Sequence, residues 1–323
     1  MKTLSDFNSF FESDLIPQLE PLEQQRKQVL NPFVAAIILV IVGLASFGLA
    51  AVVEAKFIFL VPVIILLFSF LQFSKYSKAR KNYNEVFKRI IIKELIKFVM
   101  PELYYESGYC IPQANFVNSE IFRERIDRYR GDDCVSGIVD KTAFRFSELH
   151  AEQKQITYDN KGRARETWVT IFRGIFFMGD FNKNFHGKTV VLPDQAESFL
   201  GGIFSFVQKF SAGRGELVKL ENVDFEKEFV TYSNDQVEAR YILSPALMER
   251  ILKFRKEANG RIFLSFVDSS VFVAIPVNKN LFEANVFSSA LKKDYIQEYF
   301  FYLELAVGLV EDLNLNTRIW TKE

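Results

Sequence analysis

Few residues in this chain are of types that do acid, base or metal chemistry. The 323 residues include two His and two Cys, against thirty-five Phe. His150 lies close in sequence to Glu148 and Glu152 and could act as a general base, but we favour a polar position at a strand end. His186 lies in a turn-like stretch, and the two histidines match no zinc-ligand spacing. We therefore expect no catalytic histidine and no metal site.

The cysteines, one arginine and the glycine pairs also lack a chemical signature. Cys110 and Cys134 read as buried structural thiols of a reducing compartment, with a single bridge between them as the alternative. Arg173 interrupts an apolar stretch, so we expect a structural ion pair there, and an anion site is the alternative. The pairs at 201–202 and 213–215 lack the spacing of phosphate or dinucleotide loops. No cofactor is expected.

Two uncharged apolar runs, residues 31–53 and 57–74, are separated only by residues 54–56. Each meets the length that a helix needs to cross a hydrocarbon core of about 30 Å, and the second run is the shorter fit. The sequence therefore predicts a transmembrane helical hairpin. Its small residues favour packing of one run on the other, and oligomerisation through Ser46 and Ala50 is the alternative. Neither run contains an ionisable residue, which weakens a channel or proton-relay role.

Lys and Arg are distributed unevenly around these runs. One cation lies between them, whereas eight lie between the second run and residue 100. The positive-inside rule then places both termini on the cytoplasmic side of the membrane and the short loop outside. The basic stretch after the second run is suited to anionic lipid headgroups. The expected headgroup contacts are Lys75, Lys78, Arg80 and Lys81.

The region after residue 100 carries a net charge of −4, because residues 1–30 carry −2, residues 54–100 carry +6, and the whole chain is neutral. An acidic balance argues against nucleic acid as a partner. At the other end, Leu4, Phe7, Phe11 and Leu15 recur at helical spacing, and Pro17 is expected to end this amphipathic helix. We expect its aromatic side chains to dock on the cytosolic region, with a membrane-surface or disordered segment as the alternatives. The docking residues are Phe7, Phe10 and Phe11.

The pattern beyond the runs predicts an α+β cytosolic region. In order, the expected elements are a helix over residues 75–100, strands on both sides of Asp140-Lys141, a hairpin with its tip at 159–162, a central strand over 167–177 that bends at Gly174, a strand over 189–192, a helix over 196–210, strands within 217–232, a helix that starts at Ser244-Pro245, a hairpin around 268–270, and a helix over 288–313. Recurring strands followed by a helix suggest two related lobes. The expected segments are 1–30 (cytosolic and amphipathic), 31–74 (hairpin), 75–100 (basic juxtamembrane helix), 101–215 (first lobe) and 216–323 (second lobe).

Several stretches resemble a bacterial membrane-tethered family, domain-of-unknown-function family 3137. They are GDD at 131–133, FSELHAE at 146–152, FRGIFF at 172–177, DFNK at 180–183 and DQVEARYILSP at 235–245. The resemblance implies a paired membrane helix and a cytosolic domain, with no established activity and no catalytic residue to carry over. In the last stretch we expect a strand over 237–243, so that Glu238 and Arg240 share one face as a surface pair or a partner contact.

These observations predict a membrane-anchored module that binds another protein or organises a complex at the inner face of the membrane. A homo-oligomer is also possible. The alternatives are a regulator that binds anionic lipids through the basic stretch, and an enzyme of an unrecognised type.

Overall fold

The computed structural model describes residues 2–52, 60–158, 162–181, 185–194, 213–313 and 315. The chain divides into two compact units. The helical unit comprises Lys2–Phe98 and Phe282–Phe300, and the sheet unit comprises Val99–Leu281 and Phe301–Glu323. The expected helix over 196–210, the glycine pair at 201–202, and most of the expected hairpin tip at 159–162 lie outside the described residues.

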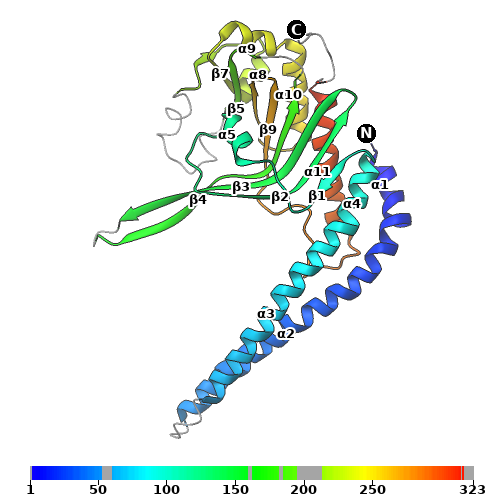
Figure 1. The fold of residues 1–323 in the computed structure, drawn as a ribbon, viewed down its shortest axis with the longest axis vertical. Helices are drawn as coiled ribbons and strands as arrows, with labels where there is room; N and C mark the ends of the chain where they lie inside the picture. The colour runs from blue at the N-terminus through cyan, green and yellow to red at the C-terminus, as the bar shows by residue number, and fades with distance from the viewer. Residues whose placement is uncertain are drawn as a thin grey trace. The chain divides into compact units, whose positions relative to one another are not determined.

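The helical unit contains two long helices and several short helical segments (Figure 1). Its elements are α1 (Leu4–Phe10), the π-helical η1 (Phe11–Leu15), α2 (Ile16–Val52), α3 (Leu60–Phe87), the π-helical η3 (Lys88–Ile92), α4 (Lys93–Val99) and the first part of α11 (Lys293–Asp312). The prediction of a helix over residues 75–100 thus corresponds to the end of α3, η3 and α4, which stop before Pro101.

The N-terminal helix starts where a capping box places it. The Thr3 hydroxyl accepts a hydrogen bond from the Asp6 N–H (3.1 Å), and the Asp6 carboxylate accepts one from the Thr3 N–H (2.8 Å). The prediction that Pro17 ends this helix is wrong, because α2 continues through it. The π-helical turn η1 ends at Leu15, two residues before Pro17, and such a wide turn accommodates the loss of the hydrogen bond that proline cannot donate.

Helices α2 and α3 lie side by side, and each is long and apolar enough to cross a membrane (Figure 1). The Ser69 hydroxyl donates to the Ala36 carbonyl (3.0 Å), so this polar group is satisfied inside the pair. A Cβ added at Gly43 would lie 3.0 Å from Leu66, which shows how closely the helices approach. The outward faces expose large apolar side chains. They include Ile37, Ile38, Ile41 and Leu44 on α2, and Val63, Ile64, Leu67, Phe68 and Phe70 on α3.

The sheet unit is built on one nine-stranded sheet with the order β1-β2-β3-β4-β9-β8-β5-β7-β6, in which all neighbours are antiparallel. The strands are β1 (Tyr104–Glu106), β2 (Arg128–Val139), β3 (Thr142–Tyr158), β4 (Ala164–Asp180), β5 (Lys188–Pro193), β6 (Glu216–Val218), β7 (Phe229–Ser233), β8 (Phe263–Val267) and β9 (Ser270–Pro276). The helices are α5 (Gln113–Asn118), α8 (Val223–Glu228), α9 (Gln236–Ile242), α10 (Pro245–Glu257) and the rest of α11. The predicted α+β class is confirmed.

The predicted lobes do not form separate sheets. Strand β5, from the expected first lobe, lies between β7 and β8 of the second, and β4 pairs with β9 across the same division. The two expected hairpins at Asp140-Lys141 and at 268–270 are present as β2–β3 and β8–β9. The strand that was expected to be central is β4, which lies inside the sheet between β3 and β9, and Gly174 has a positive φ of 147° there. A Cβ at this position would lie 2.1 Å from the Ile275 carbonyl oxygen, so only glycine fits.

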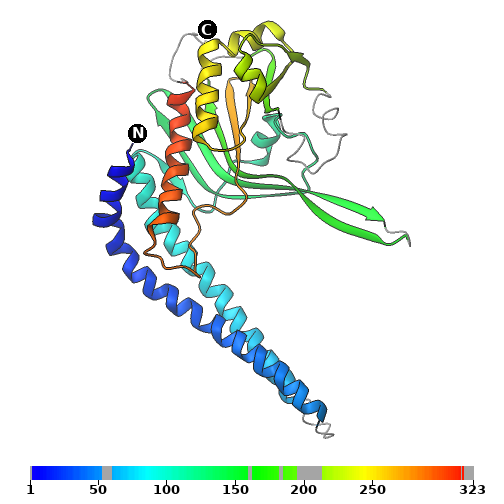
Figure 2. The same cartoon turned by 180° about the vertical axis from the view of Figure 1, so that it is seen from behind.

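Aromatic side chains fill the core between the sheet and α5. Phe116 of α5 packs against Phe122, Phe172 and Phe176, with ring centroids 5.1 to 5.8 Å apart. Figure 2 shows α10 and the end of α11 over the opposite face of the sheet from α5. There Arg250 of α10 donates to the Glu311 carbonyl of α11. Both faces of the central strands are therefore covered, which explains the nearly continuous apolar sequence of β4.

Two elements differ from the prediction for local reasons. Residues 237–243 were expected to form a strand, but α9 spans Gln236–Ile242. Asp235 caps this helix by accepting hydrogen bonds from Val237 and Glu238 N–H groups, and this local cap outweighs the alternating pattern. Asn222 similarly caps the short helix α8, which interrupts the strands expected within 217–232.

Candidate functional site

The main candidate site is a strip of charged side chains that crosses β2, β3 and β4, here named the charged strip. Its members are Arg128, Arg130, Asp132, Asp133, Glu148, His150, Glu152 and Arg173. Strand register brings them together, since Arg130 pairs with His150 and His150 pairs with Arg173. Three of the stretches that carry the family resemblance therefore supply neighbouring strands of one site.

Local backbone geometry explains why the strip has this composition. Glu148, His150 and Glu152 alternate along β3, so they share one face of the sheet. On β2 the register shifts between Asp132 and Val135, and Asp133 has a positive φ of 56°. This bulge breaks the alternation that would otherwise send neighbouring aspartates to opposite faces.

Three carboxylates gather at one end of the strip. Asp132, Asp133 and Glu148 each offer an oxygen, and these oxygens lie within 4.8 Å of one another. Such a set of oxygen donors has the chemistry that a hard divalent cation prefers. The protein itself donates hydrogen bonds to carboxylates of this group. The Tyr105 hydroxyl donates to Asp133, and the Leu281 N–H donates to Glu148 at 2.7 Å.

The middle of the strip holds the histidine, which lies within β3 rather than at a strand end. His150 Nε2 is 3.2 Å from the Thr170 hydroxyl and 3.8 Å from the Glu152 carboxylate. A hydroxyl, an imidazole and a carboxylate are the parts of a nucleophilic triad, but there the acid must engage the other ring nitrogen from the one that faces the nucleophile. Here both neighbours lie at Nε2. This geometry does not relay a proton from Thr170 through His150 to Glu152.

Arginines set the electrostatics of the strip. Arg128 and Arg130 both donate to Glu152, at 3.2 and 2.9 Å. Burial acts to raise the pKa of Glu152, but these hydrogen bonds outweigh it and lower the pKa. Burial lowers the pKa of His150, and Arg173 and Arg130 add to this shift, whereas the Glu152 carboxylate opposes it. Arg173 itself donates to the Asn280 side chain, and not to the carboxylate partner that the sequence suggested.

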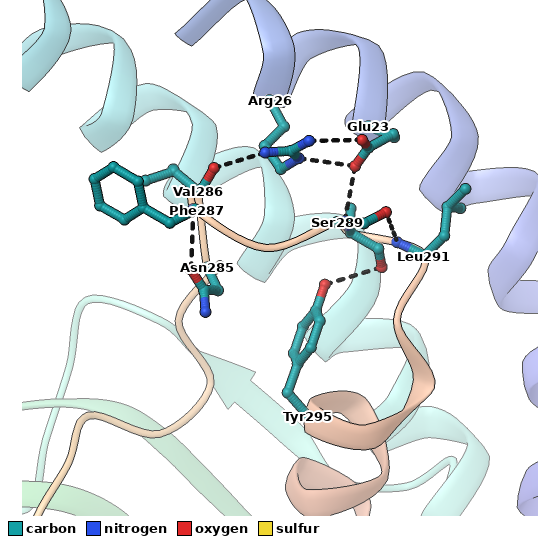
Figure 3. Close-up of polar contacts among 9 residues, drawn as sticks. Glu23, Arg26, Asn285, Val286, Phe287, Ser289, Leu291 and Tyr295 are labelled. Carbon is teal, nitrogen blue, oxygen red and sulfur yellow. Dashed lines mark hydrogen bonds and ion pairs between the residues drawn. The ribbon is translucent and has the colours of Figure 1, made fainter. Parts of the chain in front are cut away.

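The helical unit contains a second polar cluster, around Glu23 and Arg26 of α2 (Figure 3). Their side chains form a bidentate ion pair (2.7 and 2.8 Å) and are only 12% and 11% exposed. Arg26 also donates to the Val286 carbonyl, and Glu23 accepts from the Ala290 N–H, both at 2.8 Å. The hydrogen bond from Arg26 lowers the pKa of Glu23 to about 2, although burial opposes this shift.

This ion pair holds the chain segment that precedes α11. The Ala284 N–H of the same segment is bound by the Asn84 side chain of α3 (2.8 Å). Because side chains from α2 and α3 occupy these backbone groups, α11 begins at Lys293 and not near residue 288 as predicted. No local sequence signal pointed to this cluster, since Arg26 and Val286 are 260 residues apart.

The predicted docking residues lie in the helical unit. Phe7 and Phe11 are buried, and Phe10 is half-buried. Phe7 stacks on Phe300 of α11 with ring centroids 4.8 Å apart. Phe10 stacks on Phe98 of α4 at 4.1 Å. The aromatic face of the N-terminal helix therefore packs on other helices of the same unit.

The structure does not bring Glu238 and Arg240 together as a pair. Both lie on α9, where residues two apart point in different directions. Glu238 accepts hydrogen bonds from the His186 and Gly187 N–H groups (3.1 and 2.7 Å), so it fixes the loop before β5. Arg240 donates to Gln236 one turn earlier. Neither contact indicates a partner-binding role.

The remaining predicted residues are also placed. The four cations Lys75, Lys78, Arg80 and Lys81 are exposed along α3. Both cysteines are free thiols: Cys134 is buried, and Cys110 is half-buried. Burial raises the pKa of Cys134 to about 11 and also raises the pKa of Cys110, so neither is a ready nucleophile.

Comparison with known proteins supports the family resemblance. Residues 170–315 match the family described as Protein of unknown function (DUF3137). The match includes the stretches at 172–177, 180–183 and 235–245, whereas those at 131–133 and 146–152 lie before it. No curated protein and no solved structure matches the chain.

Proposed function

We propose that this chain, a member of the DUF3137 family over residues 170–315, is an inner-membrane protein that presents a protein-binding module to the cytoplasm of a bacterium. Helices α2 and α3 would form the anchor, with both termini on the cytoplasmic side. The sheet unit would bind another protein or organise a complex there. This role is not enzymatic.

One observation supports the proposal that α2 and α3 form a membrane anchor. Along the described parts of α2 and α3, exposed large apolar side chains follow one another without an ionisable residue between Asn31 and Ser74. In water these faces would leave a large apolar surface uncovered, whereas in a bilayer they contact lipid tails. Cations return at Lys75, and a basic stretch that begins there is what an anionic cytoplasmic leaflet would favour.

The geometry of the charged strip does not suit catalysis, and this supports a protein-binding role for the sheet unit. His150 is not aligned to pass a proton between Thr170 and Glu152, and Glu152 is occupied by two arginines. At the other end of the strip, the protein itself donates hydrogen bonds to the Asp133 and Glu148 carboxylates. A role in recognition therefore fits these side chains better than a role in acid and base chemistry.

Cysteine labelling tests the anchor and its orientation. Single cysteines are placed at Ala55, between the helices, and at Val237, which is 79% exposed on α9, in a chain that lacks Cys110 and Cys134. A membrane-impermeant maleimide on spheroplasts, whose outer membrane is open, should label only the first position, and lysis should make both reactive. Labelling of Val237→Cys in intact spheroplasts would reverse the proposed orientation. Release of the protein from membranes by alkaline carbonate would contradict the proposal that α2 and α3 form a membrane anchor.

Anionic-lipid binding through Lys75, Lys78, Arg80 and Lys81 is a second candidate, favoured by the exposure of all four cations. Replacement of the four by Gln should reduce the phosphatidylglycerol that stays with the purified protein after detergent exchange. A quadruple change of exposed cations in the sheet unit, at Lys141, Lys219, Lys227 and Lys256, is the matched control. Equal lipid retention by both variants would argue against anionic-lipid binding through these four cations.

A further inference from the structure

Strands β3 and β4 continue beyond the rest of the sheet as a two-stranded arm, here defined as residues 153–158 and 162–170 (Figures 1 and 2). Pairing of β2 with β3 ends at Arg128 and Glu152, and pairing of β4 with β9 ends at Gly174 and Pro276. Within the described residues, the strands of the arm therefore pair only with each other. A two-stranded ribbon of this kind is marginally stable when nothing covers it.

Apolar side chains of the arm are exposed to solvent. Tyr158 is 72% exposed, Ile156 is 52% exposed and Trp168 is 40% exposed. Register places all three on one face, because Lys154 pairs with Trp168 and Ile156 pairs with Glu166. Arg128 stacks on the Trp168 ring at 3.7 Å and braces the base of this face.

The two edges of the arm differ. Near its base the β3 edge is closed, because the Asp127 carboxylate accepts a hydrogen bond from the Lys154 N–H (3.0 Å). The β4 edge over residues 164–172 has no strand partner among the described residues. An open edge of this length is a template for the addition of another strand.

The charge of the arm indicates what kind of strand fits. Its described residues include three cations, Lys154, Arg163 and Arg165, and one acid, Glu166. The acid already binds Lys154 at 2.6 Å. Arg165 is the second residue of β4, at the open edge, and Arg163 directly precedes the strand. A segment with carboxylates would complement this edge, whereas a basic segment would be repelled.

The sequence of the arm argues against insertion into a bilayer. The connection between the strands reads Asp-Asn-Lys-Gly-Arg over residues 159–163, and such polar groups are costly in a hydrocarbon core. Ile156 and Trp168 lie along the arm, and Tyr158 ends β3 directly before this connection. They suit contact with a protein alongside the arm.

We propose that the β4 edge of this arm binds an extended acidic segment of a partner protein, which adds to the sheet as a further strand. Backbone hydrogen bonds along residues 164–172 would supply affinity, and Arg163 and Arg165 would select carboxylates. This inference rests on the proposed protein-binding function, for which it identifies the surface and the chemistry of the partner.

The test uses the full chain in nanodiscs of neutral lipid, so that lipid charge does not contribute. Three fluorescent peptides serve as probes: alternating Glu and Val, alternating Lys and Val, and the acidic peptide with alternate Val replaced by Pro. The acidic peptide should bind about tenfold or more tightly than the basic one, because of charge complementarity. The proline peptide should bind more weakly than the acidic peptide, because its proline residues cannot donate the backbone hydrogen bonds of a strand.

Charge reversal identifies the arm as the site. Arg163→Glu with Arg165→Glu should abolish the preference for the acidic peptide, while Lys141→Glu with Lys256→Glu makes the same change in net charge elsewhere and should preserve it. Circular dichroism checks that both variants fold. Equal binding of the acidic and basic peptides, or an equal effect of the two variants, would overturn the inference. The inference would also be overturned if no peptide binds and the protein forms a dimer that the Arg163→Glu, Arg165→Glu variant loses. That result would identify a second copy of the chain as the occupant of the edge.

The proposed function can fail separately. Peptide binding in nanodiscs does not depend on which side of the membrane the sheet unit occupies in the cell, whereas cysteine labelling does. A negative peptide result with correct labelling therefore rejects the arm as the binding surface and leaves the membrane-anchored module in place.

Discussion

The helical hairpin α2–α3 and the β3–β4 arm are both long antiparallel pairs that expose apolar side chains, but they expose them differently. In the hairpin, apolar residues surround the helices and all backbone hydrogen bonds lie within them. In the arm, apolar residues are interspersed with polar and charged ones, and one backbone edge is open. The first pattern suits a solvent that cannot form hydrogen bonds, and the second suits a partner that can.

The glycines of the two regions give the largest expected contrast. Gly174→Ala, where β4 meets the base of the arm, forces a side chain into a position with positive φ and onto the Ile275 carbonyl. We expect it to destabilise the sheet unit by about 3 kcal/mol or more. Gly48→Ala in α2 meets nothing within 4 Å, so it should be neutral or stabilising by up to about 1 kcal/mol. Denaturant unfolding of the purified protein measures both, and a similar loss for both would show that Gly174 is not constrained as described.

Arginine substitutions test whether the two apolar surfaces meet different environments. Ile41→Arg places a charge in the middle of the first span, at a cost of about 2.5 to 3.5 kcal/mol for insertion. Ile156→Arg places the same charge on the exposed arm, where a surface substitution changes stability by about 0.5 kcal/mol or less. The fraction of protein that resists carbonate extraction should fall only for the first variant. Equal extraction of both would contradict a lipid-facing α2.

Acid should affect the helical unit through Glu23. Its folded pKa of about 2 lies below the usual 4.5, so its contribution to stability is complete above pH 4.5 and is lost as the pH falls toward 2. We expect the melting temperature of the helical unit to drop in this range by roughly 5 °C more in the natural protein than in Glu23→Gln. Glu166→Gln removes the exposed ion pair of the arm and serves as the control, with little change in stability. A pH response that is identical in Glu23→Gln and the natural protein would assign the effect to other groups.

The smallest expected effect concerns the base of the arm. Arg128 also binds Glu152, so a double-mutant cycle of Arg128→Ala and Trp168→Ala is needed to isolate its contact with the ring. The coupling free energy should be about 0.5 to 1 kcal/mol, as for a cation over an exposed aromatic ring. A coupling near zero would mean that Arg128 does not brace the arm.

Local signals predicted several elements well. Ser244 and Pro245 start α10 as expected, because cap and first-turn chemistry depends on neighbouring residues only. The hairpins around Asp140 and Asp268 were found for the same reason, and both residues have a positive φ. The length of the apolar runs identified α2 and α3, since no tertiary contact is needed to recognise them.

Features that depend on pairing between distant parts of the chain could not be predicted from the sequence. Nothing local indicates that β5 lies between β8 and β7, which merges the two expected lobes into one sheet. The alternation of Val237, Ala239 and Tyr241 favoured a strand, although the Asp235 cap makes a helix. In the charged strip, the alternation of Glu148 and His150 was readable, but the bulge at Asp133 was not, because a register shift depends on the partner strand.

The helical unit is closed by a segment, Phe282–Phe300, that the ribosome makes only after most of the sheet unit. At about 5 to 20 residues per second, the 260 residues between Arg26 and Val286 take roughly 10 to 50 seconds to synthesise. During that interval Glu23 and Arg26 have each other but not the backbone groups that later complete their shell. A message truncated before codon 282 would therefore yield a chain that has both long apolar helices but lacks the segment that completes the cluster around Glu23 and Arg26, and quality-control proteases should remove it.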